Sequence, residues 1–207
     1  PDGGMHPAHI HANSAAIGGG IIFTFNAVNG STGMSMTDTR DDGAENSFTF
    51  SEILEVDGYV NVHLSANDLA TIVAQGDVGS NELTGESITY PLEERAVDGI
   101  SGTITFEERI NGFALATISL DGTPDGGMHP AHIHENSAAE GGSIIYTFNS
   151  VNGTTGLSMT DTRDDGAENS FTYDQVLGVD GYVNVHLSVE DLATIVAQGN
   201  IGANFTE

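Results

Sequence analysis

The chain has 207 residues and a formal net charge of −26, with 30 acidic residues against four basic ones, all of them arginine. This charge repels nucleic acids and anionic membranes, so we expect neither as a partner. No apolar run reaches the roughly 18 residues of a membrane span. Cysteine is absent, which excludes disulfides and thiolate metal sites. A hydrophobic content of 38%, with short β-branched runs, predicts a folded chain and not an acidic disordered one.

One stretch occurs twice in the chain. Residues 1–11 are identical to residues 124–134, an offset of 124 − 1 = 123 residues, and the correspondence continues to Gln75 and Gln198. A period this long predicts two tandem domains. Residues 1–80 are the first unit, which lacks counterparts of the residues before 124, and residues 81–207 are a second, nearly complete unit. The chain begins inside its own repeat without an initiator methionine, so we expect a piece of a longer protein.

The predicted elements of the first unit are short strands bounded by glycine and asparagine. Residues 18–25 predict a strand that an Asn29-Gly30 turn closes. Residues 51–56 are the one helix candidate, with Ser51 as its cap. Residues 68–75 fit either a capped helix or a strand, because a polar residue precedes a β-branched run.

In the second unit, residues 102–108 and 113–120 alternate between apolar and polar residues around an Asn111-Gly112 turn. This pattern predicts a β-hairpin. Counting seven or so short strands per unit, we expect an all-β fold of two tandem Greek-key β-sandwich or barrel units.

All eight histidines lie in repeated stretches. In a strand, alternate side chains share a face, so His9 and His11 point one way while Ile10 points the other. His63 lies on one face of the strand 59–63, and three imidazoles converge if the two strands pair or face each other. His6, held extended before a proline, is either a fourth ligand or a supporting residue. The predicted metal ligands are His6, His9, His11, His63, His129, His132, His134 and His186.

Ligation by nitrogen alone suits Cu(II) or Zn(II), and the affinity of such sites peaks at copper. We therefore expect one copper ion in each unit, with zinc as the alternative. Asn61 and Asn184 either orient a ligand or make a sheet hydrogen bond. The competing interpretation of the histidines is a set of satisfied polar residues near a sheet edge.

A second candidate site is an acidic segment, residues 38–46, which recurs as residues 161–169. Several carboxylates around a glycine turn suit calcium, which takes 6–8 oxygen ligands. The spacing is not that of an EF-hand, and a solvated acidic turn is the alternative. The candidate calcium ligands are Asp38, Asp41, Asp42, Glu45, Asp161, Asp164, Asp165 and Glu168.

The order of these motifs resembles a known family. Ala8-His-Ile-His11, a glycine-rich strand and then Tyr59-Val-Asn-Val-His63 with a closing strand resemble the chordin-type (CHRD) domain, in particular the tandem CHRD proteins of marine and soil bacteria. The resemblance covers essentially the whole chain and implies an extracellular all-β module in which residues 71–76 form the last strand. The histidine layout is also similar to the copper site of Cu,Zn superoxide dismutases. This chain lacks that family's zinc-binding loop, disulfide and active-site arginine context.

These features predict an extracellular or cell-surface metal-binding module that assembles with copies of itself or with neighbouring repeats of a longer chain. The alternatives are a superoxide dismutase-like copper enzyme, which the negative surface disfavours, and a metal-independent adhesion or matrix module. No Ser-His-Asp set, paired catalytic carboxylates or phosphate-binding loop is discernible, so the sequence favours a binding module over an enzyme.

The first unit lacks counterparts of residues 87–90, 102–108 and 113–120. A sandwich without these strands exposes apolar surface and unpaired edges. We expect strand complementation by the equivalent segment of an adjacent chain or repeat, which would link subunits into an open array or filament. The alternative is that the residues are simply absent.

Overall fold

The computed structural model describes residues 3–124 and 126–206. The chain divides into two compact units, unit 1 (Pro1–Glu82) and unit 2 (Leu83–Glu207). The described residues are mostly strand, with two helices of six residues each, so the all-β prediction is confirmed. None of the described helices has the length and apolar character needed to cross a membrane.

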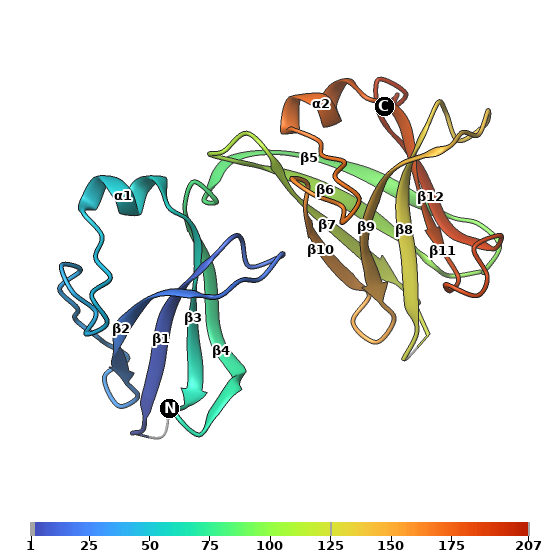
Figure 1. Cartoon of the computed structure of the whole chain (residues 1–207). Helices are drawn as coiled ribbons and strands as arrows, with labels where there is room; N and C mark the ends of the chain where they lie inside the picture. Colours follow the sequence, from blue (N-terminus) through green and yellow to red (C-terminus); the bar gives the residue numbers. More distant parts are fainter. Residues whose placement is uncertain (1–2, 125, 207) are drawn as a thin grey trace. The chain divides into compact units, whose positions relative to one another are not determined.

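Unit 1 is a single antiparallel sheet with the strand order β2-β1-β3-β4 (Figure 1). Its elements in chain order are β1 (Met5–Ala12), β2 (Ile21–Asn29), α1 (Phe50–Glu55), β3 (Asp57–Ser65) and β4 (Asp68–Gly79).

Unit 2 is a closed eight-stranded barrel with the strand order β10-β7-β6-β5-β12-β11-β8-β9, which the pairing of β10 with β9 completes (Figure 1). Its elements are β5 (Leu83–Glu94), β6 (Ser101–Arg109), β7 (Ala114–Asp121), β8 (Met128–Glu135), β9 (Ile144–Asn152), β10 (Leu157–Asp161), α2 (Tyr173–Gly178), β11 (Asp180–His186) and β12 (Ile195–Gly202).

The strands β9-β8-β11-β12 repeat the order of β2-β1-β3-β4, and the registers are the same. His9 is paired with Asn61 in unit 1, as His132 is paired with Asn184 in unit 2. Repeated sequence therefore gives repeated sheet geometry. What differs is the other half of the barrel, β5, β6, β7 and β10, which has no strand counterpart in the described part of unit 1.

The barrel interior of unit 2 holds an apolar core to which every strand except β10 contributes. Ile104, Phe106, Ile118, Ile133 and Val183 are at most 1% exposed. Alternation along each strand places these residues inside and polar residues outside. In unit 1 the residue equivalent to Val183 is Val60, and it is only partly buried.

Two local predictions are confirmed and one is wrong. β6 and β7 form the expected hairpin, and residues 68–75 lie in a strand because β4 pairs with β3 along most of its length. The helix cap was misplaced: Thr49, not Ser51, caps α1, in a capping box with Glu52. The Thr-x-x-Glu signature satisfies two backbone donors reciprocally, which a cap inside the first turn cannot do.

Paired valine truncations test the difference between the two units. We expect Val183→Ala to lower the unfolding free energy of unit 2 by about 2 kcal/mol, because it empties a fully buried site. Val60→Ala, in the same local sequence, should lower that of unit 1 by less than about 1 kcal/mol. Amide hydrogen exchange resolved by unit measures both values, and equal losses would contradict the open sheet of unit 1.

Candidate metal centre

The antiparallel pairing of β1 with β3 builds the candidate site on the face of the sheet opposite the apolar residues. His9 lies opposite Asn61 and His11 opposite Tyr59. The β1–β2 pairing shifts register between Ile10 and His11, and the β3–β4 pairing shifts between Val62 and His63. Such bulges re-aim side chains locally, and here each one adjoins a histidine of the site.

Three imidazoles converge in each unit. In unit 1 the ring centroid of His9 lies 5.8 Å from that of His11 and 5.0 Å from that of His63, and His11 and His63 are 6.0 Å apart. One nitrogen of each ring lies within 4.8 Å of one nitrogen of both others. The same holds in unit 2 for His132, His134 and His186.

Hydrogen bonds to backbone carbonyls fix two of the three rings. Nδ1 of His11 lies 2.9 Å from the carbonyl oxygen of Gly19, and Nδ1 of His63 lies 2.7 Å from that of Leu69. A carbonyl can only accept, so each Nδ1 carries the proton and each Nε2 keeps its lone pair. In unit 2 the carbonyls of Gly142 and Leu192 orient His134 and His186 at the same distances.

One ring nitrogen of each of the three histidines is buried and makes no hydrogen bond. Nδ1 of His9 and Nε2 of both His11 and His63 have no hydrogen-bond partner, and the equivalent atoms of unit 2 are in the same state. A buried polar atom without a partner costs about 1–3 kcal/mol, and each site concentrates three of them within 4.8 Å. A metal ion bound by His9 Nδ1, His11 Nε2 and His63 Nε2 would satisfy all three, so the residues fit a nitrogen-liganded ion.

Burial and neighbouring charge favour the neutral form of His9 in unit 1 and of His132 in unit 2. Burial, followed by the charges of His63 and His11, lowers the pKa of His9. Burial, with the charges of His186 and His134, lowers the pKa of His132 to about 4. Neutral imidazole is the form that binds metals, so the lowered pKa values of His9 and His132 favour metal binding at neutral pH.

His6 and His129 lie outside the two three-histidine groups. Their Nδ1 atoms are 3.2 Å from the backbone carbonyl oxygens of His63 and His186, the last histidines of each group. Both rings are buried. The sequence offers two roles for His6, metal ligand or supporting residue. Its position suits the supporting role, in which the ring holds β1 against the end of β3.

Asn61 and Asn184 contact neighbouring glutamines. Oδ1 of Asn61 accepts a hydrogen bond of 2.8 Å from Gln75, and Oδ1 of Asn184 accepts one of 2.7 Å from Gln198. Each asparagine is buried and lies opposite the first histidine of its three-histidine group in the sheet register, Asn61 opposite His9 and Asn184 opposite His132. The bond ties β3 to β4, or β11 to β12, beneath the site.

Sequence reasoning missed the parts that orient the rings. Tyr59 stacks on His11 with 5.0 Å between ring centroids, and its hydroxyl accepts a bond from the amide of Gly19. A Cβ on Gly19 would lie 2.1 Å from the carbonyl oxygen of Ala12, so the loop that offers its carbonyl to His11 requires glycine there. The glycine-rich run after the histidines was the available signal.

The acidic segments form turns stabilised by their own donors. Asp42 accepts bonds from the backbone amides of Thr24, Ala44 and Asn46 and from the side chain of Asn46. Asp38 accepts from Arg40. None of these carboxylates belongs to a metal-type cluster in the described residues. Of the two interpretations of these segments, a calcium site and a solvated acidic turn, these hydrogen bonds support the solvated acidic turn.

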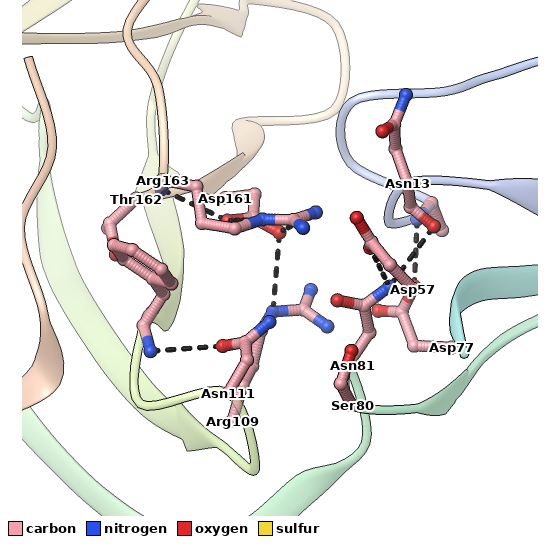
Figure 2. Close-up of polar contacts among 12 residues, drawn as sticks. Asn13, Asp57, Asp77, Ser80, Asn81, Arg109, Asn111, Asp161, Thr162 and Arg163 are labelled. Carbon is pink, nitrogen blue, oxygen red and sulfur yellow. Dashed lines mark hydrogen bonds and ion pairs between the residues drawn. The ribbon is translucent and has the colours of Figure 1, made fainter. Parts of the chain in front are cut away.

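In unit 2 the first aspartate of this segment has a different environment. Asp161 is buried, 3.7 Å from Arg109 and 3.1 Å from Arg163, and these residues are labelled in Figure 2. Its counterpart Asp38 is exposed. An arginine contributed by β6 is therefore part of how unit 2 closes around this segment.

The lowered pKa values of two aspartates predict how the stability of the acidic turn in unit 1 depends on pH. Hydrogen bonds from Asn46 and from Arg40, respectively, lower the pKa values of Asp42 and Asp38 to about 2, from an ordinary value of 3.8. Because the folded values are lowered, the turn is fully stabilised above pH 3.8 and loses this stabilisation as the pH falls towards 2. Carboxyl-carbon NMR titration should show both values below 3, and millimolar calcium should leave the Asp42 resonance unmoved. A calcium-dependent shift would restore the calcium interpretation.

Comparison with known proteins gives one distant relative. No family model matches the chain, and no solved structure matches it. The chain is 31% identical over 96 residues to cell surface Cu-Zn superoxide dismutase 4 of Candida albicans. The match includes 42% of this chain and spans 41% of the relative's length. The chain is thus distantly similar to a copper-zinc protein, in agreement with its β-barrel and histidine sets.

Proposed function

We propose that each unit binds one copper ion through three histidines, His9, His11 and His63 in unit 1 and His132, His134 and His186 in unit 2. The observation that carries the proposal is the convergence of three buried, unpartnered ring nitrogens in each unit. The relative's name supports copper or zinc. Copper ranks first because nitrogen ligands bind Cu(II) more tightly than Zn(II), and zinc is the alternative.

Metal analysis with matched variants tests this assignment. The purified protein should hold two copper ions per chain, and His63→Ala and His186→Ala should each lose one, since the two remaining imidazoles bind far more weakly. The double variant should lose both. His129→Gln is the control, because its ring lies outside the three-histidine group, and it should keep two ions. Retention of two ions in both alanine variants would contradict the assignment.

A second candidate function is superoxide dismutation, which the relative's name favours. A copper ion in these sites would supply one-electron redox chemistry. The chain's own contribution is unfavourable to an anionic substrate, because its net charge is −26 and repels superoxide. The binding module is therefore our first choice and the enzyme our second.

Ionic strength separates the two functions. If the copper-loaded protein dismutates superoxide, its rate constant should rise as salt is added from 0.01 to 0.15 M, because screening over about 8 Å weakens the repulsion. A binding module shows only the rate of free copper at any salt concentration. The apo protein and the His63→Ala, His186→Ala double variant are the controls for copper released into solution.

We further propose that the module acts outside the cell or at its surface, within a larger assembly of such units. The relative is named as a cell surface protein. The order of the histidine motifs, which resembles the chordin type, agrees with an extracellular module. Metal-independent adhesion is the remaining alternative, and it predicts that chelation leaves assembly unchanged.

A further inference from the structure

The sheet of unit 1 has an open apolar face. We call it the inner face: the side of β2-β1-β3-β4 away from the histidines. Ala8, Phe25, Val28, Val60 and Val62 line a groove of about 350 Å³ there. Two hydroxyl side chains, Ser35 and Thr37, complete its lining.

Unit 2 shows how the same surface looks when covered. At the offset of 123 residues, every residue of the groove has a counterpart of identical type, and all the counterparts are buried. Ala131, Val151, Val183 and Val185 are each 0% exposed, and Phe148 is 3% exposed. The strands opposite them in the barrel core are β5, β6 and β7. Residues 83–121 therefore have the complementary shape for this surface.

The β4 edge of the unit 1 sheet is exposed, whereas the equivalent strand of unit 2 is paired and covered. In unit 2, β12 pairs with β5 through Ala197 and Glu94, and Val196 is 0% exposed. The equivalent strand β4 is an outer strand of the unit 1 sheet, and its Val73 is 46% exposed. An edge with free backbone groups beside apolar side chains is a template for a further strand.

Residues 34–38, which also border the groove, already make the hydrogen bond that their counterparts make in unit 2. Thr37 accepts a bond of 2.8 Å from the amide of Asn26, as Thr160 accepts one of 3.0 Å from Asn149. In unit 2 this segment is strand β10 and pairs with β7, whereas residues 34–38 of unit 1 form only a bridge at Met34. The receptor segment is in place, and its strand partner is what unit 1 lacks.

The first residue of helix α1 and Asp38 are also exposed, whereas their counterparts in unit 2 are buried. The first residue of α2, Tyr173, donates its amide to Gly112 in the β6–β7 turn and is 7% exposed, whereas its counterpart Phe50 is 76% exposed. Asp161 pairs with Arg109 of β6, whereas Asp38 is on the surface. An incoming copy of β5–β7 would bring both an anchor for α1 and an arginine for Asp38.

We propose that the inner face of unit 1 is a receptor for a three-stranded β-meander with the sequence of residues 83–121, supplied by another repeat of this kind. Residues 3–124 and 126–206 contain two such faces and one such meander, and that meander closes unit 2. The inference does not depend on the metal sites, and it gives the proposed assembly its contact surface. Because both partners are acidic, apolar burial and edge pairing must drive docking, and salt should strengthen it.

An extended chain tests the proposal. A copy of residues 83–123 is fused directly ahead of Pro1, which reproduces the Thr123–Pro124 junction of unit 2. We expect the amides of residues 73–75 in β4 to exchange at least tenfold more slowly than in the unextended chain. Binding of a dye specific for exposed apolar surface should fall in parallel.

Two substitutions in the added copy serve as a matched pair. The equivalent of Phe106→Asp, which points into the core, should abolish the added protection, and the equivalent of Thr105→Asp, on the outer side, should preserve it. Unchanged exchange in β4 of the extended chain would overturn the proposal. A second result would also overturn the proposal: the unextended chain forms a dimer that Val62→Asp dissociates and that the extension leaves intact. The occupant of the inner face would then be a second unit 1.

Discussion

The pairing of β1 with β3, and of β8 with β11, is the constraint on which the rest of each unit depends. It places Ala8 and Ile10 beside Val60 and Val62 on one face and puts the histidines on the other. Because side chains alternate with a period of two, a slip of one residue would exchange the two faces completely. One register therefore specifies both the apolar layer and the metal-type site.

The two units separate what local sequence determines from what packing determines. The bonds that orient the rings, from His11 to Gly19 and from His134 to Gly142, both measure 2.9 Å. Burial of the apolar face differs, because it depends on β5–β7 and not on the shared sequence. Identical residues such as Val60 and Val183 are therefore buried to different extents, and we expect them to contribute differently to stability.

Most of the strand pattern and the grouping of three histidines followed from the sequence, because alternation, glycine turns and repetition are properties of residue type. The helix cap was missed although the Thr49-x-x-Glu52 signature was present. The sequence offers two roles for His6, ligand or supporting residue, and does not decide between them because the register shift between His6 and Ala8, which breaks the simple alternation, is visible only in the structure. The carbonyls of Gly19 and Leu69 were not predictable, since every residue offers a carbonyl and only the loop conformation aims it.

The two faces of the sheet would be stabilised by different partners. A metal held by His9, His11 and His63 would link β1 to β3, the central strands, and would bind only the folded arrangement. The proposed meander would cover the inner face and would pair at its edges, along β4 and along residues 34–38. The ring-orienting bonds have the same lengths in the open unit and in the closed one. The geometry of the three-histidine group is therefore independent of the cover on the other face, so the proposed docking of a meander would leave the proposed metal site intact.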